Sequence, residues 1–389
     1  MMPPMMRCKK PNVMKNIVYI LQSLSVWGGL NRIEADKLNG LAETGKYNVS
    51  VVCMCQRKNS ENVYQLSDKV KQICLAQIFD PKKSFWANPV GFFIGRMRWR
   101  RNSKRKLMEV LRDLRPDIVV TTINYVPDGF HQLKTKTVIE CHGSISNIIH
   151  DRLVPWYSKL TIHRDARHAT AVATLTRGDA ALWTTARRVE VIPNFTHIRP
   201  SAPCNYRSRR VVTLGRLAPE KGYDLLVDAW KTVAERHPAW HLDIYGSGGG
   251  KNSLQQQIDG LGLSSHIHLH PFTDDVASAY ARAAFYVLSS HQEGFPLVLI
   301  EAMRCGLPCV SFDCPSGPRE IITDGHDGIL VPYRGLSREE QVDGLAQALC
   351  RMMDHEEQIP TMGKAAQETS RKYTTENVIP MWERLFDSL

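Results

Sequence analysis

The stretch FYVLSSHQEGFPLVLIE (residues 285–301) decides the fold. Its first six residues have the length of a strand, and Pro296 suits the first turn of a helix that continues through Met303. A helix that begins there directs free backbone N–H groups and the positive end of its dipole into the loop, where a phosphate binds well. Glu293 and Glu301 then accept hydrogen bonds from hydroxyl groups on either side of that phosphate. A nucleotide sugar offers this order of hexose, diphosphate and ribose, although isolated glutamate pairs with this spacing are common.

Three strand ends that lie upstream carry compatible signals. Arg216 and Lys221 follow one apolar strand, Gly246 follows the next, and Phe272 follows the histidine-rich strand at residues 266–270. Ligands of an open parallel sheet bind outside the carboxyl ends of its strands. Two cations at that edge neutralise a diphosphate, and a glycine lets a ligand approach the backbone. Taken alone, the loop that carries Arg216 and Lys221 is equally compatible with solvated basic residues.

Taken together, these segments resemble the retaining nucleotide-sugar glycosyltransferases of family four, also called glycosyl transferases group 1. Residues 313–322, followed by Gly325, Gly328 and Val331-Pro332, resemble the members that add galactose, N-acetylgalactosamine or related hexoses during capsule, lipopolysaccharide or lipid-linked glycan assembly. The order and spacing of the segments carry the resemblance, since each segment alone is weak. The matching segments are residues 28–32, 175–179, 191–194, 215–221, 245–248, 272 and 293–301.

The resemblance implies an α/β protein of the GT-B fold, in which two Rossmann-like domains face each other across a cleft. Alternating strand and helix signals in the first half independently favour a parallel sheet. We expect a disordered lead at residues 1–13, an acceptor domain at 14–195 and a proline-containing linker at 196–209. A donor-binding domain follows at 210–372. Residues 373–389 have the apolar spacing of an amphipathic helix, which the resemblance places back on the first domain.

The resemblance also implies the roles of individual residues. Arg216 and Lys221 stabilise the leaving diphosphate, Glu293 and His142 orient the hexose, and Glu301 binds the ribose. No residue of the protein acts as a nucleophile, and no metal or cofactor is required. The implied catalytic residues are His142, Arg216, Lys221 and Glu293. The implied donor-binding residues are Gly28, Gly29, Arg216, Lys221, Gly246, Phe272, Glu293, Gly294, Phe295, Leu297, Val298 and Glu301.

The implied activity is transfer of a hexose, with retention, from a nucleotide-diphosphate sugar to a lipid-linked or surface-glycan acceptor, and a UDP-linked sugar is the expected donor. A nucleotide-sugar epimerase or hydrolase on the same fold remains an alternative. So does a non-catalytic scaffold that binds membranes or nucleic acid. The pair Gly28-Gly29 is followed by no third glycine, which argues against a dinucleotide fingerprint and an NAD-dependent oxidoreductase.

Composition narrows the class of protein further. The 389 residues fit two domains, and 43% hydrophobic with 23% charged residues are ordinary for a globular protein. The ten cysteines form no CxxC pattern, so we expect reduced, mostly buried thiols rather than a zinc site or disulfides. No apolar stretch approaches the ~18 residues of a membrane span, and the first fifteen residues lack the apolar core of a signal peptide. We therefore expect a cytoplasmic protein.

The charge distribution suggests a membrane surface as a partner. The formal net charge is +11, and residues 96–106 contain seven basic residues in eleven, with several aromatic residues in and before this segment. We expect it to bind an anionic leaflet, which makes the protein peripheral at the inner face of the membrane. No motif supports recognition of nucleic acid, and a solvated helix face is the alternative. The expected membrane-binding residues are Arg98, Trp99, Arg100, Arg101, Lys104 and Arg105.

Overall fold

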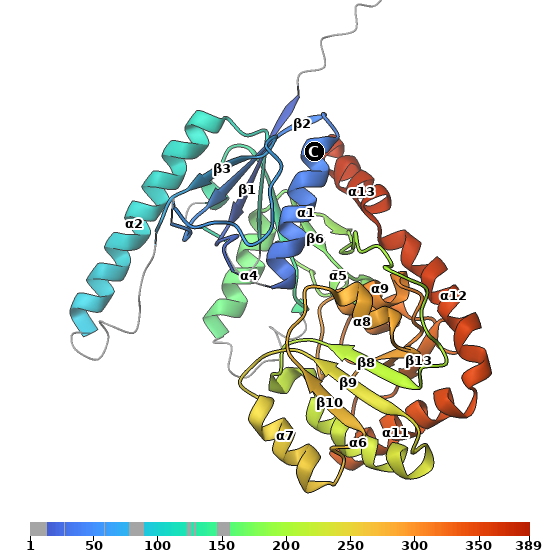
Figure 1. The fold of residues 1–389 in the computed structure, drawn as a ribbon. Coiled ribbons are helices and arrows are strands. Elements are labelled where there is room, and N and C mark those ends of the chain that lie inside the picture. The colour runs from blue at the N-terminus through green and yellow to red at the C-terminus, as the bar shows by residue number, and fades with distance from the viewer. Residues whose placement is uncertain are drawn as a thin grey trace, which may run out of the picture.

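The computed structural model describes residues 14–26, 28–57, 59–77, 89–122, 126–127, 130–145 and 156–389. The expected lead at residues 1–13 lies outside them. The described chain forms two parallel sheets with helices around each, and Figure 1 shows them as two successive domains. The strand order is β3-β2-β1-β4-β5-β6-β7 in the first sheet and β10-β9-β8-β11-β12-β13 in the second. Two Rossmann-like parallel sheets are the predicted architecture.

The first sheet is built on runs of β-branched residues that are buried on both faces, as parallel strands require. Its inner strand β1 pairs with β2 on one side and with β4 on the other, so that Ile17 lies beside Val49 and Ile118. The edge strand β3 is half-exposed, and the sequence analysis did not predict it. The strands are β1 Lys15–Leu21, β2 Tyr47–Cys53, β3 Lys71–Cys74, β4 Ile118–Thr122, β5 Lys136–Cys141, β6 Ala171–Thr174 and β7 Val189–Val191.

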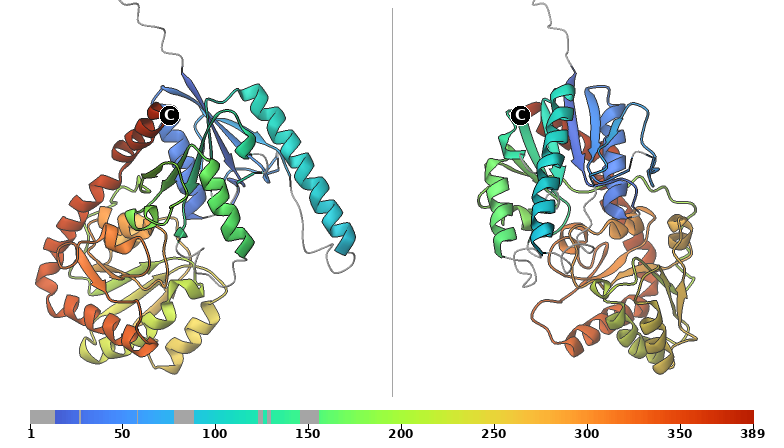
Figure 2. Two further views of the ribbon diagram at one scale, coloured as in Figure 1. Left: turned by 180° about the vertical axis from the view of Figure 1, so that it is seen from behind. Right: turned by 90° about the vertical axis from the view of Figure 1, so that its left-hand side faces the viewer.

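The helices of the first domain vary in length and exposure. The longest, α2, runs along one side of the sheet in Figures 1 and 2, and its amino-terminal end extends beyond the domain. The short α5 is capped by the Thr176 side chain, which accepts a hydrogen bond from the Asp179 backbone N–H. The helices are α1 Gly29–Glu43, α2 Pro89–Leu114, η2 Phe130–Gln132, α4 Trp156–His168 and α5 Arg177–Ala180.

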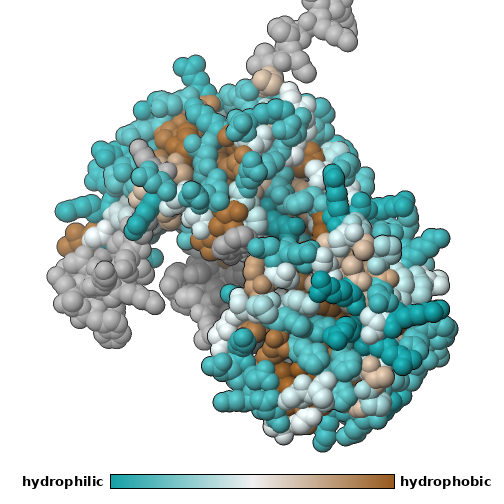
Figure 3. Space-filling view, viewed as in Figure 1, coloured by the Kyte–Doolittle hydropathy of each residue, from teal (hydrophilic) through white to brown (hydrophobic). Residues whose placement is uncertain are grey.

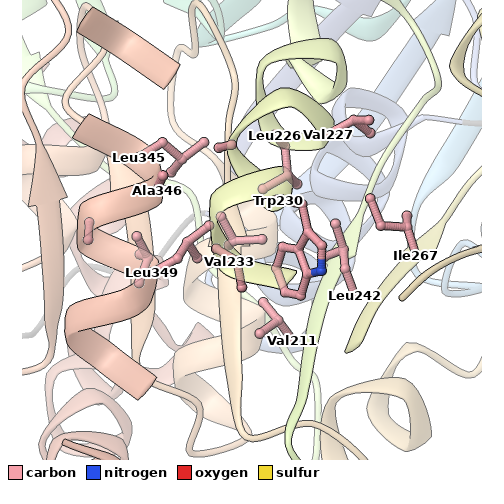
Figure 4. Packing of buried hydrophobic residues seen from close by; sticks show 14 of the residues in the cluster. Val211, Leu226, Val227, Trp230, Val233, Leu242, Ile267, Leu345, Ala346 and Leu349 are labelled. Carbon is pink, nitrogen blue, oxygen red and sulfur yellow. The ribbon is translucent and has the colours of Figure 1, made fainter. Parts of the chain in front are cut away.

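The second domain repeats the doubly wound plan. Trp230 of α6 is fully buried in its core, and Figure 4 shows its ring beside Val211 and Leu242, with Leu349 of α11 nearby. The strands are β8 Arg210–Leu214, β9 His241–Tyr245, β10 Ile267–His270, β11 Phe285–Leu288, β12 Cys309–Phe312 and β13 Gly328–Val331. The helices are η3 Pro219–Lys221, α6 Tyr223–Arg236, α7 Lys251–Gly260, α8 Val276–Ala281, α9 Leu297–Arg304, α10 Pro318–Ile321, α11 Arg338–Asp354, η4 Glu356–Gln358 and α12 Ile359–Ser370.

The last helix of the chain returns to the first domain. After η5 Arg371–Tyr373, α13 spans Thr375–Ser388 and buries Val378, Trp382 and Phe386 in the same core as Leu38 of α1. Figure 1 shows α12 and α13 running up the side of the molecule from the second domain to α1. The first domain therefore contains the chain's last helix as well as its amino-terminal half.

The described residues bear on two expectations from the sequence, the state of the cysteines and the presence of a membrane-spanning helix. All nine cysteines among them are free, and most are buried. No helix in the described part of the chain is both long and apolar enough to cross a membrane.

Candidate active site

The loop between β11 and α9 has the predicted order of strand, loop and helix. β11 ends at Leu288, Pro296 occupies the cap position, and α9 begins at Leu297. Glu293 lies in this loop, and Glu301 lies inside α9, where it is 5% exposed. The start of α9, where a helix offers backbone N–H groups to an anion, therefore follows Glu293 by four residues in sequence.

Lys221 and Glu293 come together at the carboxyl edge of the second sheet. The Lys221 Nζ lies 2.8 Å from Glu293 Oε1, and both side chains are largely buried. Their strands, β8 and β11, are neighbours in the sheet. Gly222 makes this approach possible, because it has a φ of 61° and a Cβ there would lie 2.1 Å from the Ser289 carbonyl oxygen. Two of the four predicted catalytic residues are thus in direct contact.

Arg216 is oriented by a residue that the sequence analysis did not single out. Its guanidinium pairs with the Glu220 carboxylate, while 71% of the Arg216 side chain remains exposed. Hydrogen bonding to its own backbone N–H is the first cause that lowers the pKa of Glu220, and Arg216 lowers it further. The spacing of four residues between Arg216 and Glu220 was the available signal. Arg216 therefore lies at the end of β8 as predicted, and its guanidinium pairs with Glu220.

The neighbouring strand ends lie along the same edge. Gly246 follows β9 and packs so closely on the β8 loop that a Cβ there would lie 2.0 Å from the Gly215 carbonyl oxygen. Phe272 follows β10 and is 57% exposed. The strands β8 to β11 run parallel, so their carboxyl ends share one edge, as predicted.

The two domains touch at this edge. Gly294 faces the first domain, and a Cβ there would lie 2.7 Å from the His142 carbonyl oxygen and 3.1 Å from the Gly143 Cα. A Cβ on Gly29 would lie 3.3 Å from Leu297 Cδ1 at the start of α9. Predicted residues from the two halves of the chain are therefore neighbours at the domain interface, with glycines where the backbones approach.

Glu301 faces the first domain. Its Oε1 accepts a hydrogen bond from Arg32 of α1 at 3.0 Å. Burial raises the pKa of Glu301 above its usual range, although the Arg32 and His197 charges oppose that shift. Arg32 lies in a segment that carried the family resemblance, but no role in the site was predicted for it.

His142 is held by two carboxylates of its own domain. Its Nε2 lies 2.8 Å from Glu34 Oε1 and 3.2 Å from Glu140 Oε1. Burial alone lowers the pKa of His142, but Glu140 and Glu34 raise it to about 9. Glu34 was not predicted as part of the site, and its position one turn before Lys37 on α1 was the only local signal.

Comparison with known proteins assigns the chain to a family. Residues 27–199 match the family described as Glycosyltransferase Family 4, and residues 194–369 match the family described as Glycosyl transferases group 1. The two matches together run from residue 27 to residue 369. The chain belongs to the group 1 glycosyltransferases of family four, which confirms the predicted family.

Similar sequences have related names. An uncharacterized glycosyltransferase of Haemophilus influenzae is 25% identical over 95% of this chain and 99% of its own length. The amylovoran biosynthesis glycosyltransferase AmsD of Erwinia amylovora is 29% identical over 56% of this chain and 62% of its own. Together with the family matches, these relatives show that the protein is a glycosyltransferase enzyme.

Solved structures agree on the fold. TarM superposes with a TM-score of 0.76 at 16% identity, covering 96% of this chain and 99% of TarM. The lipopolysaccharide outer core galactosyltransferase WaaB gives 0.72 at 19% identity, over 96% and 100% of the two chains. Anabaena HepE in complex with UDP and glucose gives 0.71 at 18% identity, over 97% and 100%. The predicted GT-B fold is therefore confirmed.

Proposed function

We propose that this protein is a retaining hexosyltransferase that moves galactose, N-acetylgalactosamine or a similar sugar from a UDP-linked donor to a lipid-linked or surface-glycan acceptor. In this proposal Arg216, Lys221 and the amino-terminal end of α9 stabilise the leaving diphosphate. Glu293 and His142 orient the hexose, and Glu301 binds the ribose. No metal ion takes part.

The contact between Lys221 and Glu293 carries the proposal. It brings a cation and a carboxylate within 2.8 Å of each other beside the start of α9. A sugar diphosphate needs both groups side by side, since its phosphate is anionic and its hexose offers hydroxyl donors. Fixed charges are most effective where charge develops in the transition state, which here is the leaving diphosphate.

The names of similar proteins support the donor and acceptor classes. HepE is described in complex with UDP and glucose, which supports a UDP-linked hexose. AmsD is named for amylovoran biosynthesis, and WaaB is named as a lipopolysaccharide outer core galactosyltransferase. These names support a polysaccharide or lipid-linked acceptor for this chain.

A screen of donors and acceptors tests the proposal. The purified protein is incubated with UDP- and GDP-linked hexoses, with and without lipid-linked oligosaccharide acceptors, and products are followed by mass spectrometry. NMR of the new glycosidic bond reports its anomeric configuration. Transfer with retention from a UDP-hexose is expected. Donor hydrolysis or epimerisation that does not depend on the acceptor would instead support the alternative activities, and inversion at the anomeric carbon would contradict the mechanism.

We also propose that α2 docks on an anionic membrane, where a lipid-linked acceptor is found. Arg98, Arg100 and Arg101 are exposed on this helix, and so are the apolar side chains of Ile94 and Met97, at 54% and 72%. Basic and apolar side chains on one exposed segment fit the interfacial region of a bilayer. The rest of the surface seen in Figure 3 is mostly hydrophilic, with apolar residues in scattered patches.

A further inference from the structure

Four charged or titratable side chains form a closed cluster beneath the domain interface. Glu34 and Lys37 lie one turn apart on α1, and Glu140 and His142 lie at the end of β5. The Lys37 ammonium contacts Glu34 Oε2 at 3.0 Å and also both oxygens of Glu140. His142 completes the cluster, because its Nε2 lies close to both carboxylates.

The four side chains of this cluster are buried. None of its four side chains is more than 8% exposed. The rings of Tyr19 from β1 and Trp382 from α13 each lie 5.0 Å from the Lys37 ammonium, in the range of a cation–π contact. The helix that returns from the second domain thus covers the buried charge.

Charge balance then determines the state of His142. Two buried carboxylates and one ammonium leave one negative charge without a partner, and an uncompensated buried charge is costly. A protonated His142 makes the cluster neutral. The pKa shifts agree: burial raises the pKa of Glu140, but Lys37 and His142 lower it to about 2. Burial lowers the pKa of His142, but the two carboxylates raise it to about 9.

A metal ion is a poor occupant of this cluster. Glu34, Glu140 and His142 offer ligand atoms within 4.8 Å of one another. However, the Lys37 ammonium already contacts both carboxylates and supplies the positive charge that an ion would bring. The donor set therefore fits a buried ion network.

Two buried atoms of the cluster, Glu34 Oε2 and His142 Nδ1, make no hydrogen bond among the described residues, but Glu34 Oε2 has the Lys37 ammonium as an ion-pair partner. The Nδ1 of His142 is buried and has no hydrogen-bond partner among the described residues. Gly294 of the second domain packs against the backbone of the same residue. We infer that Glu34, Lys37 and Glu140 are positioning residues that hold His142 as an imidazolium, so that its Nδ1–H donates to an oxygen atom of the ligand. The identity of this ligand as a donor hexose rests on the proposed function.

The charge state of His142 is directly measurable. Histidine-selective ¹³C labelling and NMR follow the titration of each imidazole, and His142→Gln identifies the resonance of His142. In the wild-type protein we expect this imidazole to stay protonated through pH 8. A titration midpoint below pH 8 overturns the inference, and this measurement needs neither a substrate nor a folded Glu34 variant.

Glu34→Gln tests the cause of that state. The substitution keeps the size of the side chain and removes one charge, so Lys37 balances Glu140 and His142 no longer needs a proton. We expect its midpoint to fall by at least one pH unit, which is about tenfold in proton affinity. Asp36→Asn is the matched control on the same helix, because it removes one carboxylate charge that contacts a different histidine, His197, at 3.0 Å. An unchanged midpoint in Glu34→Gln, or an equal shift in both variants, contradicts the inference.

A kinetic readout separates positioning from folding. The KM of the wild-type enzyme for the donor should stay level between pH 6.5 and 8, whereas that of Glu34→Gln should rise as its lowered midpoint is passed. Glu34→Asp, which restores the charge, should restore the level profile. Level profiles in all three proteins would mean that the ligand does not use the imidazolium. If the NMR result holds but no sugar is transferred, the proposed function fails and the charge assignment stands.

Discussion

The Glu301 carboxylate is shared between the domain interface and the proposed nucleotide site. Arg32 binds one of its oxygens, and burial keeps the pKa of Glu301 raised despite this partner. A ribose that binds Glu301 therefore meets a group that already has a cationic contact. This contact fixes the direction of the carboxylate before any ligand arrives.

Glu301→Ala should weaken the binding of UDP. The loss of one or two charge-assisted hydrogen bonds costs about 1.5–3 kcal/mol each, so affinity should fall by about tenfold or more. Isothermal titration with UDP measures the effect. Glu235→Ala, at an exposed site on α6, is the control and should leave affinity unchanged. If Glu301→Ala binds UDP as the wild type does, Glu301 does not bind the ribose.

Lys221→Ala and Arg216→Ala should act mainly on kcat. Negative charge on the diphosphate grows as the sugar–phosphate bond breaks, and interactions that strengthen in the transition state set kcat. We expect a loss of about 10²-fold or more in kcat and a smaller change in donor affinity. Steady-state kinetics with a saturating acceptor separate the two effects. A raised KM with normal kcat would show that these cations only bind the donor.

At the scale of elements, two helices of the first domain differ in how they pack against it. In α13, Trp382 is 2% exposed, packs beside Phe386 at 5.7 Å between ring centroids, and covers the Lys37 ammonium. In α2, Ile94, Met97 and Arg98 are exposed, while Leu107 and Leu111 anchor the carboxyl-terminal half of the helix in the core. One helix thus completes the first domain, and the other extends from it.

Trp382→Ala should destabilise the first domain. Truncation of a buried tryptophan typically costs about 3–5 kcal/mol, and here it also exposes a buried ammonium group. Urea unfolding followed by circular dichroism measures the loss. Arg384→Ala, on the exposed side of the same helix, should stay within about 0.5 kcal/mol of the wild type. Equal stability of the two variants would argue against α13 as part of this core.

Neutralising α2 should release the protein from membranes. Changing Arg98, Arg100, Arg101 and Arg105 to glutamine removes four positive charges, and electrostatic attraction decays over about 8 Å at physiological salt. Co-sedimentation with phosphatidylserine-containing vesicles should fall, and UDP binding should remain. The control variant changes four exposed basic residues of the second domain to glutamine, which removes the same charge. Those residues are Lys231, Lys251, Arg351 and Lys364. Equal release of both variants would mean that net charge alone matters, and equal sedimentation of wild type and the α2 variant would show that the helix face is merely solvated.

At the scale of the whole molecule, the two sheets meet through contacts between distant parts of the chain. Arg32 and Glu301 are 269 residues apart, and the Glu320 side chain accepts hydrogen bonds from the backbone N–H groups of Arg177 and Gly178 at the start of α5. Both contacts join charged groups of one domain to the other. The interface is therefore polar as well as close-packed.

Transfer activity should survive an excess of EDTA. In the proposed mechanism Arg216, Lys221 and the start of α9 stabilise the charge of the diphosphate, so turnover does not require a divalent cation. Turnover is measured after chelation and again after addition of magnesium or manganese. Loss of activity with EDTA and recovery with either metal would show that a metal ion stabilises the leaving group.

The sequence was sufficient to predict the elements that repeat a simple pattern. Strands such as β1 and β11 are apolar on both faces, and parallel strands bring their carboxyl ends to one edge, so the positions of Lys221 and Glu293 followed. By contrast, β3 is a half-exposed edge strand with lysine and glutamine in it, and its pattern resembles a loop. The pairing of Arg32 with Glu301 and of Lys37 with Glu140 was not predictable, because the partners are 269 and 103 residues apart. Local spacing carries no information about such pairs.

The position of α13 has a consequence for how the protein is made. A ribosome synthesises the amino-terminal sheet first, and domains usually fold in that order as they emerge. Here Val378, Trp382 and Phe386, which close the core over α1, are translated only after the entire second domain. Until then, the nascent first domain keeps an apolar face open to water and Lys37 uncovered. The domain that is synthesised first is therefore the last to complete its folding. Until α13 is added, its open apolar face is a surface that a chaperone can bind.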